Sequence, residues 1–115
     1  MIKSKIPILP KPYIIPYDFD YAGIINTTYA VADKMLEIES VRKRVYRGVC
    51  ISETEIISAA KHIIHKKDEI YSLYQTSELL NKNNNRQTLN YLDEFFMIIE
   101  NEKKFKRYIL DSCGR

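Results

Sequence analysis

Two aspartates stand two residues apart among aromatic side chains, and they are the residues of this sequence best suited to chemistry. Asp18 and Asp20 lie within residues 16–23, which read PYDFDYAG. Side chains alternate along an extended chain, so both carboxylates would lie on the same side. Carboxylate oxygens are ligands that hard divalent cations prefer. The pair indicates either a site for Mg²⁺ or Mn²⁺ or a solvated, capping pair of acids in a turn.

A basic cluster follows at Arg42, Lys43, Arg44 and Arg47. Arg42, Arg44 and Arg47 could bind an anion or a protein partner, or they could pair with the two aspartates, which would make those aspartates structural. Other basic residues occur at position 61, at 66–67 and at 103–107. Acidic residues flank each of these groups, so we expect solvated faces and do not favour a nucleic-acid binder.

Histidines and cysteines form no recognisable metal motif. His62 and His65 stand three residues apart, with Glu69 one turn further along, and a zinc site would need another ligand from elsewhere in the fold. We expect both histidines to be exposed. Cys50 and Cys113 lack the spacing of a zinc motif and are too few for a disulfide framework, so free thiols are the first expectation and a single disulfide is the alternative.

The elements that must position these residues begin with a proline-rich segment. All four prolines fall within the first sixteen residues, which prevents a helix there. Residues 6–9 and 13–17 are rich in branched and aromatic side chains and predict two short strands around a turn. Residues 24–32 have no helical period and predict an ordered loop. Ser40 and Gly48 bracket a predicted short helix over 41–47, with Val41 and Val45 inward and the basic residues outward.

The clearest helix signal is the capping box at Ser52 and Glu55. From there a helical stripe runs to about residue 75 and comprises Ile56, Ala60, Ile63, Ile64, Tyr71 and Tyr74. Lys67 falls inside this stripe, so either its aliphatic stem lies along the apolar face or the helix bends at residues 66–68.

Two further helices are predicted in the last third of the chain. The asparagine-rich residues 81–85 predict a connecting loop. A long helix then covers about residues 86–100, with an inner face of Leu89, Leu92, Phe95, Phe96 and Ile99. A terminal helix covers residues 102–110, with Phe105 and Ile109 one turn apart.

Length and charge set the frame for these elements. The chain has 115 residues, 45% of them apolar, and a formal net charge of +3. We predict one domain, with an extended segment and acidic loop over residues 1–32 and a helical part over 40–112. The predicted fold is mainly α, a bundle of three to four helices with a short extended or β-hairpin N-terminal segment. No run approaches the length of a membrane span, and no signal peptide is recognised, so a cytoplasmic location is expected.

Residues 16–26, 40–50 and 91–96 together resemble the C-terminal portion of a family of uncharacterised bacterial proteins with a PYDFD motif. Longer members of that family carry an upstream segment like GNTDW…HN. The pairing resembles the catalytic loop and metal-binding aspartate of atypical kinase-like folds of the HipA and spore-coat CotH type. The resemblance covers about residues 13–110. It implies that Asp18 is the counterpart of the metal-binding aspartate of the kinase DFG motif and that Asp20 is an accessory ligand.

This sequence departs from the kinase-like pattern in the parts that hold phosphates. It has no NTDW or HN segment, no glycine-rich loop and no strand lysine in a nucleotide-binding lobe. The expected function is therefore the C-terminal part of a kinase-like domain that carries a divalent-cation motif without independent catalysis. The alternative is a helical protein-interaction or self-association module with no ligand site. If the upstream half is absent, we expect an exposed apolar surface and a homo-oligomer or protein partner through the N-terminal segment.

Overall fold

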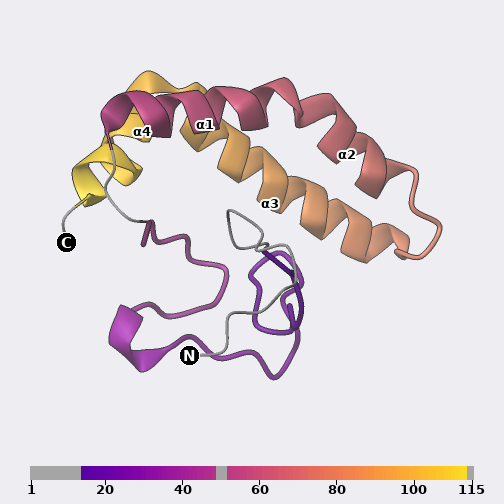
Figure 1. Ribbon diagram of the computed structural model, residues 1–115. Helices are drawn as coiled ribbons and strands as arrows, with labels where there is room; N and C mark the ends of the chain where they lie inside the picture. The colour runs from indigo at the N-terminus through magenta and orange to yellow at the C-terminus, as the bar shows by residue number, and fades with distance from the viewer. Residues whose placement is uncertain (1–13, 49–51, 114–115) are drawn as a thin grey trace, which may run out of the picture.

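Four helices form the ordered frame of the chain, and residues 14–48 run alongside them in turns and irregular backbone (Figure 1). The structure is a computed structural model that describes residues 14–48 and 52–113. The helices are α1 (Glu53–His65), α2 (Lys67–Gln75), α3 (Lys82–Glu100) and α4 (Glu102–Tyr108), with short 3-10 turns η1 (Lys34–Leu36) and η2 (Leu110–Ser112). No strand occurs in these two ranges. The mainly α prediction is confirmed. The predicted strand over residues 13–17 is wrong for residues 14–17, which form no strand, and residues 6–9 and 13 lie outside the described residues.

The capping box begins α1 as the sequence predicts. The Ser52 hydroxyl oxygen accepts a hydrogen bond from the Glu55 amide at 3.3 Å, and the Ser52 hydroxyl donates to the Glu55 carboxylate at 3.0 Å. The glutamate thus reaches back to the serine hydroxyl, whereas in the general capping-box pattern it reaches the serine amide. Either contact holds the first turn closed.

The predicted helix to residue 75 is interrupted at Lys66, which joins α1 to α2 with a φ of −90° and a ψ of 4°. Lys67 lies just after the break. Its Nζ is 2.6 Å from Glu100 Oε1 and 5.1 Å from the centroid of the Phe96 ring. Both alternatives for Lys67 are therefore realised: the helix bends, and the lysine covers an apolar ring while its charged end stays paired at the surface.

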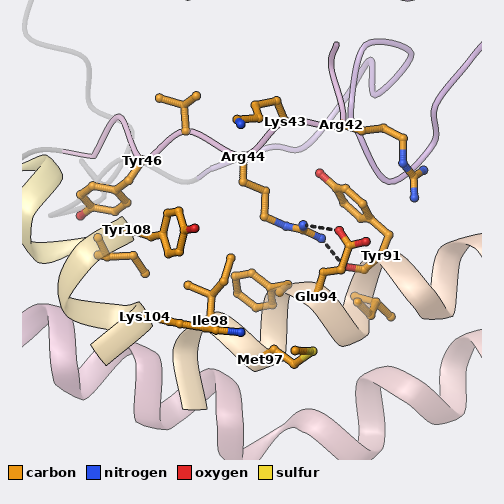
Figure 2. Close-up of a pocket in the computed structure, with 14 residues that line it drawn as sticks. Arg42, Lys43, Arg44, Tyr46, Tyr91, Glu94, Met97, Ile98, Lys104 and Tyr108 are labelled. Carbon is orange, nitrogen blue, oxygen red and sulfur yellow. Dashed lines mark hydrogen bonds and ion pairs between the residues drawn. The ribbon is translucent and has the colours of Figure 1, made fainter. Parts of the chain in front are cut away.

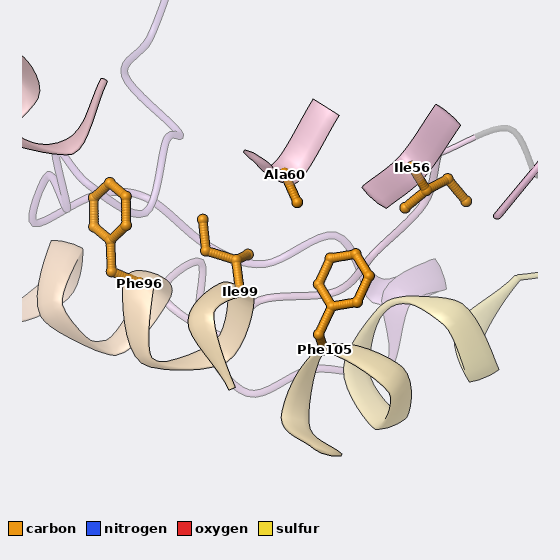
Figure 3. Close-up of a cluster of buried hydrophobic side chains, with 5 residues drawn as sticks. All are labelled: Ile56, Ala60, Phe96, Ile99 and Phe105. Atoms are coloured by element: carbon orange, nitrogen blue, oxygen red, sulfur yellow. The ribbon is translucent and has the colours of Figure 1, made fainter. Parts of the chain in front are cut away.

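The core lies where α1, α3 and α4 meet. The buried cluster consists of Ile56, Ala60, Phe96, Ile99 and Phe105 (Figure 3). Phe96 is the most deeply enclosed, with 2% of its surface exposed. α3 contacts α1, α2 and α4, so it is the central helix of the arrangement. Ile63, which the predicted stripe placed on the apolar face, is exposed.

The predicted asparagine loop is wrong, because α3 already begins at Lys82. The Asn81 side chain accepts a hydrogen bond from the Asn84 amide at 2.9 Å, so Asn81 is the N-cap. The following asparagines form the first turn. Asparagine is unfavourable inside a helix but favourable as an N-cap. A run of asparagines therefore predicts a loop unless its first residue caps a helix, as Asn81 does. The loop before α3 therefore lies N-terminal to Asn81.

The predicted helix over residues 41–47 is also wrong. Ser40 closes only one turn: its hydroxyl oxygen accepts from the Arg42 amide at 3.1 Å and its carbonyl from the Lys43 amide at 3.0 Å. Beyond that turn the backbone is irregular. Val41 is half-buried and Lys43 and Arg47 are exposed, as predicted. The orientation differs from the prediction at three residues, since Arg42 and Arg44 are half-buried and Val45 is exposed. The physical reason is that both guanidinium groups find partners on α3.

The C-terminal end follows the prediction with a shorter helix. Asn101 caps α4 through a bond from the Lys104 amide at 3.0 Å, and α4 ends at Tyr108 before η2. Cys113 packs against the core cluster, while Cys50 lies outside the described residues, so the state of the two thiols stays a prediction. In the described ranges no helix has the length and apolar character needed to cross a bilayer.

Candidate functional site

The acidic segment forms a tight turn that its own neighbours hold in place. The Tyr29 hydroxyl donates to Asp20 Oδ2 at 2.8 Å, and the Thr27 hydroxyl donates to the Asp20 carbonyl at 2.9 Å. The rings of Tyr21 and Tyr29 meet edge to face with centroids 6.3 Å apart. The hydrogen bond to Asp20 raises the pKa of Tyr29 above its usual value, because ionising the hydroxyl would place two negative charges together. Asp20 thus has a structural role in this turn.

Asp18 lies in the left-handed region of backbone space, with a φ of 58°. This conformation interrupts the extended alternation from which a shared side for Asp18 and Asp20 was predicted. Both side chains are exposed. Across residues 14–48 and 52–113, no group of three or more histidine, cysteine or acidic side chains is placed to hold a metal ion. Cation binding by the two aspartates stays a prediction.

Of the three arginines that could have paired with the aspartates, Arg42 and Arg44 contact α3 instead. Arg42 donates to the carbonyl oxygens of Gly23 and Gln87 at 3.1 and 3.4 Å. Its guanidinium carbon lies 4.4 Å from the centroid of the Tyr91 ring. Arg42 therefore joins the acidic loop to the middle of α3 while its charge rests on an aromatic face.

Arg44 makes the more extensive contact. Its Nη1 lies 3.1 Å from Glu94 Oε2, its Nη2 donates to the Tyr91 carbonyl, and its guanidinium carbon is 3.8 Å from the Tyr91 ring centroid. One tyrosine ring thus receives two guanidinium groups. Tyr91 is a site residue that the sequence interpretation missed; the available signal was an aromatic residue at the edge of the apolar face of α3.

The close approach of the acidic loop to Tyr91 requires a glycine at position 23. A β-carbon at this position would collide with the Tyr91 hydroxyl and with the Val41 carbonyl. Because glycine has no β-carbon, the backbone can approach α3 closely at this position. Tyr91, Arg42 and Gly23 together attach the irregular N-terminal half to the helices.

An open groove of about 800 Å³ lies between residues 42–46 and the helices α3 and α4 (Figure 2). Its apolar lining comes mainly from Leu92, Phe95, Met97, Ile98 and Ile109. Tyr46 and Tyr108 lie toward one end of the view in Figure 2 and Tyr91 toward the other. The groove therefore has an apolar floor with tyrosine side chains toward both ends.

The rim of this groove is basic. Its charged lining residues are Arg42, Lys43, Arg44 and Lys104, opposed by the single carboxylate of Glu94. Arg44 is paired with that carboxylate. By contrast, the ammonium groups of Lys43 and Lys104 are exposed and make no ion pair with any residue that the structure describes. Two cations on the rim are thus available to an acidic ligand.

The other predicted candidates lie away from the groove. Arg47 is exposed and lines a smaller hollow with Tyr21 and Asp33. His62 and His65 are exposed on α1, as expected. Tyr71 donates to Asp93 at 2.5 Å, and burial followed by this bond raises the pKa of the Tyr71 hydroxyl well above its usual value.

Comparison of the chain with protein-family models, with curated proteins and with solved structures finds no match. Any function proposed for the chain therefore rests on its own geometry.

Proposed function

We propose that this chain is a self-association module and that residues 14–36 form part of its contact surface. The observation that carries the proposal is the exposure of large apolar side chains along this segment. Ile14, Ile15 and Tyr17 are 94%, 79% and 82% exposed, and Val31 and Met35 are also exposed. No residue in 14–48 is buried, although this range holds many of the aromatic and branched side chains of the chain.

The energetics favour covering this surface. Burying an isoleucine or methionine side chain that was exposed contributes about 1.5–3 kcal/mol. Contiguous apolar surface on a monomer is a common mark of a protein interface. A second copy is the proposed occupant because the same chain carries the apolar groove with a basic rim described above, which complements an apolar segment containing two acids.

The test is sedimentation velocity of the full chain across a wide range of concentration. We expect a reversible shift from monomer to a larger species. Ile14→Ser combined with Ile15→Ser should move this shift to much higher concentration. Leu79→Ser is the matched control, because Leu79 is 96% exposed in the loop before α3, far along the chain from the proposed surface. A monomer at every concentration would refute self-association.

Divalent-cation binding by Asp18 and Asp20 is the second candidate function. It is the function that the resemblance to kinase-like folds implies for these two residues. The observation that favours it is that both carboxylates are exposed in one turn and that the Tyr29 hydroxyl orients one of them. Titration calorimetry with Mg²⁺ or Mn²⁺ tests it, with Asp18→Asn as the comparison. Equal heats for the two proteins would remove this candidate.

A further inference from the structure

We propose that the basic groove between residues 42–46 and α3–α4 receives residues 14–21 of a second copy of this chain. This inference rests on the self-association proposed above and names the surface that the segment occupies. The groove and the segment are both described, and the groove lining contains no residue from 14–21 of its own chain. Each copy therefore presents a segment and a groove that its own residues 14–21 do not line.

The apolar parts of the segment and the groove correspond. The segment reads IIPYDFDY, with two isoleucines followed by aromatic residues at Tyr17, Phe19 and Tyr21. All of these side chains are exposed. The groove offers an aliphatic and aromatic floor with tyrosines toward both ends, a lining that suits isoleucine and aromatic side chains (Figure 2).

The charges correspond as well. Asp18 and Asp20 make no ion pair with any described residue, and neither do Lys43 and Lys104 on the groove rim. Asp20 accepts a hydrogen bond only from the neutral Tyr29 hydroxyl, so two carboxylates without an ion-pair partner on the segment match two such ammonium groups on the groove. Because Arg44 is already held by Glu94 and Tyr91, the lysines are the groups expected to meet the incoming acids.

The arrangement predicts a closed dimer. If the segment of each copy enters the groove of the other, the two contacts are equivalent and related by a two-fold axis. Tyr91 contacts both the groove and the loop that carries the segment. It lines the groove and, through the close approach of Gly23, it also holds the loop from which the segment departs. The segment is therefore presented from a fixed point beside the groove.

The first experiment measures the dimer of the full chain after charge reversal on the rim. Lys43→Glu combined with Lys104→Glu should weaken dimerisation about tenfold or more, since two attractions become repulsions. Lys61→Glu combined with Lys82→Glu is the matched control, because it makes the same charge change on exposed helical residues outside the groove. Circular dichroism checks that helix content is unchanged.

The second experiment is a charge exchange between copies. The Lys43→Glu and Lys104→Glu chain is mixed with a chain carrying Asp18→Lys and Asp20→Lys. Each alone should be mainly monomeric, and the mixture should form a heterodimer with restored affinity. A labelled peptide of residues 14–21 should also bind the full chain, more weakly as salt rises, and should not bind the rim variant.

The outcomes separate this inference from the proposed function. A dimer that survives the rim reversal but is lost with Ile14→Ser and Ile15→Ser upholds self-association and overturns the groove as the receptor. A monomer at all concentrations overturns both. A monomer in which the rim reversal releases residues 14–21, seen as faster hydrogen exchange, shows that the segment enters its own groove and overturns the exchange between copies.

Discussion

Replacing Tyr91 by leucine should release residues 41–47 from α3. The guanidinium carbons of Arg42 and Arg44 lie 4.4 and 3.8 Å from the centre of the Tyr91 ring. A cation–π contact at an exposed site contributes about 0.5–1 kcal/mol, so loss of both weakens the attachment by about 1–2 kcal/mol. The detached population should rise about five- to thirtyfold.

Trypsin cleavage after Arg44 measures this population, because the protease must draw the Arg44 side chain out of its contacts with Tyr91 and Glu94. When a segment opens and closes faster than it is cut, the cleavage rate follows the open population. Cleavage after Lys61, on the exposed face of α1, reports helix opening and serves as the internal reference.

Tyr91→Phe is the matched control, since it keeps the ring and removes only the hydroxyl. We expect its cleavage after Arg44 to stay close to that of the wild type. The reasoning would be refuted if Tyr91→Leu, with unchanged helix content, were cut after Arg44 no faster than the wild type. In that case the ion pair with Glu94 and the backbone bond to Tyr91 would be sufficient to hold the segment.

Three further predictions concern the helices. Phe96→Ala removes the most enclosed core side chain and should lower the free energy of unfolding by about 3–5 kcal/mol, measured by urea denaturation. Asn81→Ala removes the N-cap of α3 and should cost about 1 kcal/mol, whereas Asn84→Ala, which keeps the capped amide, should not destabilise the chain. Because the folded state raises the pKa of Tyr71, the folded state holds this proton more tightly than the unfolded chain does. The contribution of Tyr71 to the free energy of unfolding should be fully present below the ordinary tyrosine pKa of about 10 and should decrease as the pH rises above that value. In urea titrations, Tyr71→Phe should reduce this loss of stability at alkaline pH.

The helical half of the fold could be predicted because its signals are local. Ser52 and Glu55 lie within one turn, and the spacing of Ile56 and Ala60 in α1 and of Leu92, Phe96 and Ile99 in α3 places each set on one face. The predicted start of α3, at about residue 86, lies four residues beyond its actual start at Lys82, and the reason is also local. Asparagine favours both loops and caps, and only the bond from the Asn84 amide to the Asn81 side chain distinguishes the two roles.

The site depended on contacts that no local pattern encodes. The sequence presents the arginines of residues 41–47 as the outer face of a helix, but Arg44 reaches Glu94, which lies 50 residues further along the chain. Those distant partners on α3 outweigh the weak helix preference of a segment only seven residues long. The same contacts turn Arg42 and Arg44 inward and leave Lys43 on the rim of the groove.

The sequence by itself determined that this chain is mainly helical, that helices begin at residues 53 and 102 and end at residues 75 and 100, and that residues 16–23 are acidic and aromatic. Only the tertiary structure decided which charges remain unpaired. Arg44 is paired with Glu94 and Arg42 donates to Gly23 and to Gln87 of α3, whereas Asp18, Asp20 and the two rim lysines have no ion-pair partner among the described residues. The physical reason is that capping and helical periodicity act within a few residues, while pairing of charges depends on how segments far apart in the chain are brought together.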